Sequence, residues 1–362
     1  MPVDRPIYDT FPDPVVLLDR NRHVIYANHA ARELLECRAE GGDLAMSIRH
    51  PAVLDAIDRL RSGANEHITE VTFPVPVERT FELNALRIDP KAPGAADMQA
   101  PVRDVLFFRD VTQAVRAEKM RVDFVANASH ELRSPLAAVV GFIETLKGAA
   151  SDDRKARGRF LDIMEREAQR MLRLIDDLLS LGRVEANEHV RPRGTVDVRS
   201  TVRAALDIVQ ARAQQRGVGF RLEWPDELPV VAGDADQLTQ VFRNLIENAI
   251  IHGPRDSEIG IDIEAVSRIP ESGRAGVVVR VHDDGGGIPK EVIPRLTERF
   301  YRVDMARSRS GPDSSTGLGL AIVKHIVARH RGRLAIESEP GDGTTFSIYI
   351  PSDIPVLPTP AP

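Results

Sequence analysis

The sequence predicts a multidomain α+β protein: a small α/β domain, a long antiparallel helical hairpin and an α/β sandwich. Its 362 residues exceed the length of one ordinary domain, so two or three are expected. Apolar and polar residues alternate at several places before residue 110, but from Thr112 the apolar residues recur at helical spacing. After residue 195 helical and strand patterns alternate again, which indicates a further α/β domain.

Residues 1–111 are expected to form the first domain, a small α+β module. Two short strands around a turn and a helix come first, and three longer strands follow. A stretch rich in Pro, Gly and Ala, residues 89–101, indicates a loop before the last strand. The expected strands are 15–19, 23–26, 67–73, 80–88 and 102–108, and the expected helix is 28–35.

Residues 112–188 predict two long helices joined by a short loop at 148–153, where Asp152 or Asp153 can cap the second helix. The apolar stripe of the first helix is Val115, Met120, Phe124, Ala128, Leu132 and Leu136. That of the second is Phe160, Met164, Met171, Ile175, Leu178 and Leu181, with Glu167 among them. Such a hairpin has little core of its own, so we expect two copies to form a four-helix bundle, and hence a homodimer.

Residues 189–352 predict a third domain in which helices and strands alternate. The expected helices are 200–216, 236–251 and 316–330, and the expected strands are 219–224, 258–265, 276–283, 333–338 and 343–349. Residues 353–362 contain four prolines and are expected to be a disordered tail.

Composition excludes several classes of function. A net charge of −6 and a pI near 6.0 argue against a nucleic-acid partner, which would require a basic face. The single cysteine, Cys37, excludes an internal disulfide and a zinc site built from several cysteines. No run of 18 apolar residues and no signal peptide is present, so we expect no membrane segment in this chain. We expect a cytoplasmic location, either for the chain alone or for the chain as the cytoplasmic part of a longer membrane protein or an associate of a membrane signalling complex.

Three short motifs are ambiguous when each is taken alone. Residues 283–289, Asp-Asp-Gly-Gly-Gly-Ile-Pro, follow an apolar strand and suit either an ordinary turn or close approach to a ligand. Residues 316–323 place two glycines where a helix begins, which suits either a helix cap or phosphate binding. Asn244 and Asn248 lie on one helix face, where two amides hold a hydrated cation or simply meet solvent.

Taken together, the order and spacing of these motifs resemble the ATP-binding domain shared by histidine kinases, gyrase-type ATPases and the Hsp90 chaperone. The resemblance implies ATP and Mg²⁺ as cofactors. It implies that Asn248 ligands Mg²⁺ with Asn244 nearby, and that Asp283 recognises the adenine amino group. It further implies an adenine pocket shaped by Gly285 and Gly287 and a phosphate site at Gly317, Leu318 and Gly319.

Residues 298–304 resemble the phenylalanine-containing box of the same family, with Phe300 at its centre. The polar residues 305–315 that follow are expected to act as a lid over ATP. Arg307 and Arg309 are expected to reach the phosphates, although exposed loop arginines commonly face water.

A histidine within residues 124–136 separates a kinase from the other ATPases. The imidazole of His130 is a competent nucleophile near neutral pH, and the adjacent Glu131 can accept its other N–H proton. Ser134 lies one turn further on, where a hydroxyl can orient a water molecule, and Pro135 is expected to bend the helix.

This segment closely resembles the phospho-acceptor box of histidine kinases. The resemblance implies that His130 is phosphorylated with Glu131 as general base. It also implies transfer of the phosphoryl group to an aspartate on the receiver domain of a response regulator. Many family members also dephosphorylate that partner, and Ser134 is the residue expected to take part.

Residues 13–19, 26–31 and 109–112 resemble a PAS sensor module, in which His29 and Cys37 are expected to be structural. The sequences of residues 47–51 and 185–189 are most similar to those of phosphate-regulon sensor kinases, which implies phosphate-starvation signalling.

The sequence departs from the family at three positions. Ile251 stands where a basic residue is usual, His252 where an aromatic is common, and Ser134 where Thr or Asn is usual. Ile251 favours the main alternative, an ATP-binding regulatory scaffold without phosphotransfer. An ATPase or chaperone with the same nucleotide fold is a second alternative, and the histidine-bearing hairpin argues against it.

Overall fold

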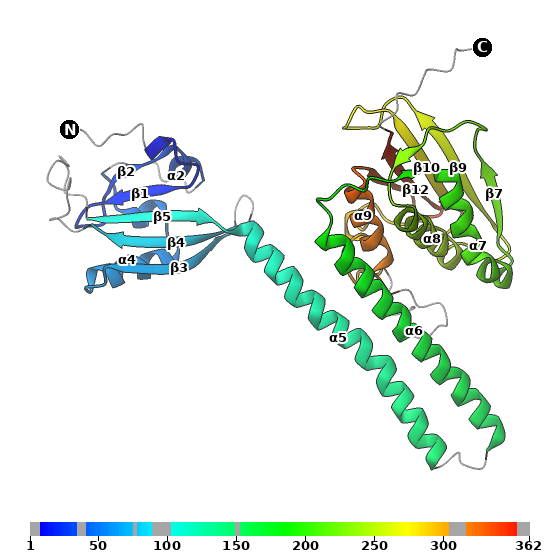
Figure 1. Ribbon diagram of the computed structural model, residues 1–362. Coiled ribbons are helices and arrows are strands. Elements are labelled where there is room, and N and C mark those ends of the chain that lie inside the picture. The colour runs from blue at the N-terminus through cyan, green and yellow to red at the C-terminus, as the bar shows by residue number, and fades with distance from the viewer. Residues whose placement is uncertain are drawn as a thin grey trace. The chain divides into compact units, whose positions relative to one another are not determined.

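The computed structural model describes residues 8–34, 41–74, 78–88, 103–148, 153–303 and 316–352 (Figure 1). Two compact units make up the chain, residues 1–125 and 126–362. Among the described residues no helix is both long and apolar enough to cross a membrane.

The first unit is built on a five-stranded antiparallel sheet with strand order β2-β1-β5-β4-β3. Its strands are β1 (Val15–Leu18), β2 (Val24–Ala27), β3 (Glu66–Phe73), β4 (Arg79–Arg87) and β5 (Asp104–Asp110). Its helices before the hairpin are α2 (His29–Leu34), α3 (Leu44–Ser47) and α4 (Pro51–Arg61). The five strands and α2 confirm the expected elements to within two residues at each end.

Helix α4 covers the inner face of this sheet and was not expected from the sequence. Its buried residues Val53, Ile57 and Leu60 join Phe81 of β4 and Phe108 of β5 in one core. The signal for this helix was available, because His50 caps its N-terminus, Pro51 occupies the first turn and the apolar residues follow helical spacing.

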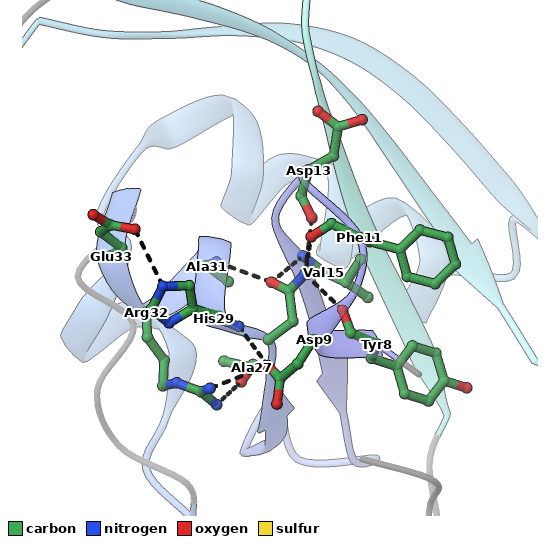
Figure 2. Close-up of polar contacts among 11 residues, drawn as sticks. Tyr8, Asp9, Phe11, Asp13, Val15, Ala27, His29, Ala31, Arg32 and Glu33 are labelled. Carbon is green, nitrogen blue, oxygen red and sulfur yellow. Dashed lines mark hydrogen bonds and ion pairs between the residues drawn. The ribbon is translucent and has the colours of Figure 1, made fainter. Parts of the chain in front are cut away.

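The buried side chain of Asn28 organises the N-terminal segment of the first unit. Figure 2 labels its partners Tyr8, Asp13, Val15 and Ala31. Its amide nitrogen donates to the carbonyl oxygens of Tyr8 at 3.1 Å and Asp13 at 2.9 Å. Its amide oxygen accepts from the backbone N–H groups of Val15 and Ala31, each at 2.9 Å. One side chain therefore joins residues 8–15 to the start of α2.

The hairpin consists of α5 (Thr112–Lys147) and α6 (Arg154–Ala186), which confirms the two long helices expected from the apolar stripes. Helix α5 remains continuous through Pro135. Asp153 caps α6 by accepting from the backbone N–H groups of Lys155 and Ala156, each at 2.9 Å. Near the turn, Phe142 stacks on Phe160 with ring centroids 5.1 Å apart.

The rest of the second unit is a mixed sheet of order β11-β12-β10-β9-β7, in which β7 runs parallel to β9 and the other pairs are antiparallel. Its strands are β7 (Gly219–Glu223), β9 (Glu258–Val266), β10 (Gly276–Asp283), β11 (Arg333–Ser338) and β12 (Thr344–Pro351). A two-stranded ladder joins β6 (Thr195–Val196) to β8 (Val231–Ala232). The bounds of β10 and β11 are those expected from the sequence.

Helices α7 (Val198–Arg216), α8 (Ala235–His252) and α9 (Gly319–Arg329) accompany this sheet, with a short 3-10 helix η2 (Ile293–Arg295). Helix α8 packs on β9 and β10, α9 packs on α8 and β11, and α7 packs on α8 (Figure 1). Helix α9 begins at Gly319, three residues later than expected, because Gly317 adopts a positive φ of 71°. This arrangement places the C-terminal end of α8 beside the end of β10, and the middle of α8 beside the start of α9.

Candidate active site

Helix α8 carries the two asparagines, and Asn244 contacts the start of α9. Asn244 is buried, with 6% of its surface exposed, and its amide nitrogen donates to the carbonyl oxygen of Gly319 at 3.2 Å. Arg243 donates to the amide oxygen of Asn244 at 3.3 Å. Asn248 lies one turn further along the same face and is partly exposed. Of the two amides, Asn244 is therefore held by protein, and Asn248 is the one open to a ligand.

Asp283 ends β10 as a buried carboxylate, 5% exposed. One of its oxygens accepts from the backbone N–H of Gly285 at 3.0 Å, and burial raises the pKa of this carboxyl. Its remaining lone pairs can accept a hydrogen bond from a ligand. The carboxylate lies next to the end of α8, because a Cβ placed on Gly253 would lie 3.8 Å from the Cβ of Asp283.

Glycines allow the loop after β10 to lie against two other segments. A Cβ on Gly285 would lie 3.0 Å from the carbonyl oxygen of His252 at the end of α8. Gly287 has φ of 67°, and a Cβ there would overlap the carbonyl oxygen of Glu339. Backbone therefore packs on backbone at both glycines, which a side chain would prevent.

Phe300 and Gly317 lie side by side, although sixteen residues of sequence separate them. The backbone N–H of Phe300 donates to the carbonyl oxygen of Gly317 at 2.8 Å. A Cβ on Gly317 would lie 2.9 Å from the Cα of Phe300, so only glycine fits there. Leu318 is fully buried and fixes the first turn of α9, whose free N–H groups suit phosphate oxygens. The expected lid residues, with Arg307 and Arg309, lie outside the described residues.

The backbone carbonyl of Ile251 is contacted by a cation from another element. The guanidinium of Arg216, at the end of α7, donates to the carbonyl oxygen of Ile251 at 2.8 Å and also contacts that of Ile250. Arg216 thus satisfies carbonyl groups at the C-terminal end of α8, the end that lies beside Asp283.

His130 lies on α5 with an exposed side chain, and Ser134 is exposed one turn further on. Glu131 forms an ion pair with Arg170 of α6, at 3.3 Å between a guanidinium nitrogen and a carboxylate oxygen. In the part of the chain that the structure describes, no hydrogen bond or ion pair joins His130 to the nucleotide-site residues. Arg170 was missed in the sequence, because spacing alone does not show which residues of two helices face each other.

Acidic residues of α6 contact one residue before and one residue after the segment 304–315. Asp177 accepts from the hydroxyl of Thr316 at 2.7 Å, and burial raises the pKa of Asp177. Glu185 pairs with Arg299 at 2.6 Å and with His325 of α9 at 3.4 Å. A cleft of about 530 Å³ lies along the same part of α6, lined mainly by α6 and the first half of α8. It contains none of the residues expected to bind ATP.

Three family descriptions match this chain. Residues 233–354 match the histidine kinase-, DNA gyrase B- and HSP90-like ATPase, and residues 120–187 match the His Kinase A (phospho-acceptor) domain. Residues 5–71 match a PAS domain.

Several known proteins are similar to a large part of this chain. The phosphate regulon sensor protein PhoR of Pseudomonas aeruginosa is 34% identical over 342 residues, covering 93% of this chain and 71% of PhoR. The sensor histidine kinase WalK of Bacillus subtilis is 31% identical over 350 residues, 94% of this chain but only 53% of WalK. The solved structure of the Acinetobacter baumannii histidine kinase AdeS is 25% identical, with a TM-score of 0.48, covering 62% of this chain and 98% of AdeS.

A gyrase- and HSP90-type ATP-binding domain joined to a phospho-acceptor hairpin defines a protein kinase that acts on histidine. The chain belongs to the sensor histidine kinases of two-component systems. The expected fold class, the PAS, hairpin and ATP-binding modules and the use of ATP are thereby confirmed.

Proposed function

We propose that His130 is the phosphorylated residue and that its phosphoryl group passes to an aspartate on the receiver domain of a response regulator. The observation that carries this proposal is the exposed position of His130 on α5, within the residues that match the phospho-acceptor domain. An exposed imidazole is accessible both to the ATP-binding domain and to a separate protein. The corresponding boundaries are 1–111 for the sensor, 112–188 for the hairpin and 189–352 for the catalytic domain.

Nucleotide binding is assigned to the residues that converge at the ends of α8, β10 and α9. Asp283 accepts from the adenine amino group in a pocket bounded by Gly285 and Gly287, and Gly317, Leu318 and Gly319 lie at the phosphates. Phe300, Arg307 and Arg309 complete the site. Asn248 would hold Mg²⁺, because an amide oxygen suits this hard cation. The ion would supply positive charge at the phosphates.

Glu131 is proposed as the base that accepts a proton from the imidazole of His130, which makes the other ring nitrogen a better nucleophile. Arg170 holds the carboxylate of Glu131 by an ion pair on one side. Transfer itself depends mainly on the positioning of His130 in line with the terminal phosphate. Ser134 is proposed to orient the water that attacks the phosphorylated response regulator when the kinase acts as a phosphatase.

A homodimer is proposed, formed through the hairpin. Between residues 136 and 179 of α5 and α6, seven large apolar side chains are exposed in the single chain, each over more than a third of its surface, which supports burial against a second copy. They are Leu136, Val140, Ile143, Leu161, Leu172, Ile175 and Leu179.

The proposed signal is phosphate starvation, and the proposed location is the cytoplasm, where ATP and response regulators are found. The similarity to PhoR along 93% of this chain supports the first assignment. The match to an ATP-binding domain supports the second.

The test is incubation of the purified protein with radiolabelled ATP and Mg²⁺, beside His130→Ala, Asn248→Ala and, as a control, His189→Ala at another exposed histidine. We expect label that is acid-labile and alkali-stable in the wild type and in the control, and none in the other two variants. Wild-type protein that binds ATP without becoming labelled would instead support a regulatory scaffold. Ile251→Lys would then be the first variant to test for recovery of labelling.

A further inference from the structure

Three buried polar residues form a row across the strand ends that carry Asp283. Ser338 of β11 pairs directly with Thr344 of β12, and Thr344 pairs directly with Asp283 of β10. Directly paired residues project from the same face of a sheet. The three residues are between 5% and 8% exposed. The strands β10 and β12 and the helix α8 that packs against this sheet are labelled in Figure 1.

The hydroxyl of Ser338 uses its full hydrogen-bonding capacity. It accepts from the backbone N–H of Ile288 at 2.8 Å and donates to the carbonyl oxygen of Gly343 at 2.7 Å. Its third contact is the hydroxyl oxygen of Thr344 at 2.9 Å. A serine hydroxyl has one proton, and a carbonyl oxygen can only accept. With the proton of Ser338 used at Gly343, the hydroxyl of Thr344 must donate to Ser338.

This direction of donation decides what Thr344 can offer to a ligand. Its only proton points toward Ser338, so toward any other group its oxygen can only accept. Asp283 beside it is a carboxylate, which also only accepts. Two neighbouring acceptors suit an amino group, such as that on C6 of adenine, and repel the keto oxygen on C6 of guanine.

We propose that Ser338, by fixing the proton of Thr344, makes the site selective for 6-amino over 6-keto purine nucleotides. The proposal rests on the proposed role of Asp283 in adenine recognition. Ser338 is a positioning residue, because it acts through Thr344 and through the loop at Ile288 and does not itself touch the base.

The selectivity role differs from a purely structural role in a measurable way. Loss of the bond from Ile288 would loosen the loop at residues 285–288 and weaken every purine nucleotide alike. Loss of the acceptor for Thr344 would free the threonine proton to point toward the base, which helps a keto group and removes an acceptor from an amino group. Only the second effect changes the ratio of the two affinities.

The experiment measures the dissociation constants of ATP and GTP, with Mg²⁺, by calorimetry at about pH 8, well above the ordinary pKa of a carboxyl. We expect Ser338→Ala to lower the ratio of the GTP to the ATP dissociation constant by about tenfold or more. Ser347→Ala is the control, because Ser347 is a buried serine of β12 that pairs with Arg280 and Ala335 away from Asp283. It should leave the ratio unchanged. Equal weakening of both nucleotides by Ser338→Ala would overturn the proposal.

A second measurement uses the wild-type protein and so does not depend on the folding of a variant. Purine riboside triphosphate has only hydrogen at C6, whereas inosine triphosphate has a keto oxygen there. Two acceptors should repel that oxygen, so we expect inosine triphosphate to bind about tenfold more weakly. Equal binding of these two analogues, with ATP still bound tightly, would contradict the proposed role of Ser338 but not the proposed function. Failure of the wild type to bind ATP would contradict the proposed function itself.

Discussion

At the scale of single residues, adjacent glycines after β10 face different surroundings. Gly287 has φ of 67°, and a Cβ would overlap the carbonyl oxygen of Glu339. Gly286 has no atom within 4 Å of an added Cβ and no positive φ. The sequence alone could not rank these neighbours, because the contact at Gly287 comes from a turn more than fifty residues away.

We therefore expect Gly287→Ala and Gly286→Ala to differ sharply. Gly287→Ala should lower the free energy of unfolding by about 2 kcal/mol or more, since it adds backbone strain to a steric overlap. It should also weaken ATP binding severalfold. Gly286→Ala should change stability by less than about 0.5 kcal/mol. Urea unfolding followed by the fluorescence of Trp224, the only tryptophan, measures both. Similar stability of the two variants would contradict the packing of Gly287 on Glu339.

In the first unit, the side chain of Asn28 makes amide contacts that join residues 8–15 to α2. Its partners Tyr8, Asp13, Val15 and Ala31 are labelled in Figure 2. Asn28→Ala leaves several backbone groups without partners, and each such group costs about 1–3 kcal/mol when buried. We expect amide hydrogens of residues 8–31 to exchange much faster, as measured by mass spectrometry. Asn84→Ala is the control, because Asn84 is only partly buried and makes a weak side-chain hydrogen bond of 3.4 Å. Unchanged exchange in Asn28→Ala would show that other contacts hold the segment.

At the scale of elements, the start of α8 depends on a buried histidine of another element. His330, just after α9, is fully buried; its Nδ1 donates to the carbonyl oxygen of Ile326 at 2.7 Å and its Nε2 accepts from the backbone N–H of Asp234 at 3.0 Å. Only the neutral ring can accept at Nε2. Burial holds the pKa of His330 below its usual value.

The pH dependence of stability follows from this contact. A lowered folded-state pKa means that, just below the unfolded pKa of about 6.5, the unfolded chain binds more protons than the folded one. The contribution of His330 is thus present above about pH 6.5 and is lost as pH falls. We expect the unfolding free energy, reported by Trp224, to fall more steeply between about pH 7 and 5 in the wild type than in His330→Gln. The difference between the two proteins isolates this group from carboxyls such as Asp283. Parallel curves would contradict a neutral, hydrogen-bonded His330.

Most elements were predictable from the sequence, and the failures have physical causes. The long stripes of α5 and α6 and the apolar strand β10 are strong periodic signals. Helix α9 begins late because Gly317 must adopt a left-handed conformation against Phe300, a constraint imposed by tertiary contact. In the candidate site, too, local patterns were predictable and tertiary contacts were not. Asn244, Asp283 and the glycines were identifiable as motifs. Ser338 and Arg170 were not, because their roles come from cross-strand and cross-helix pairing.

At the scale of the whole molecule, the hairpin leaves apolar side chains exposed that a second copy would cover. Leu172 is 62% exposed on α6, and Leu136 is 53% exposed on α5. A charge introduced at the centre of a helical bundle costs several kcal/mol unless it is paired. We therefore expect Leu172→Glu to convert a dimer of about 80 kDa, twice the 40.0 kDa chain, into a monomer in sedimentation equilibrium. Ile208→Glu is the matched control, because Ile208 is 57% exposed on α7, outside the hairpin. It should remain dimeric. A dimer that survives Leu172→Glu but not Ile208→Glu would place the interface on the catalytic domain and contradict a four-helix bundle formed by the two hairpins.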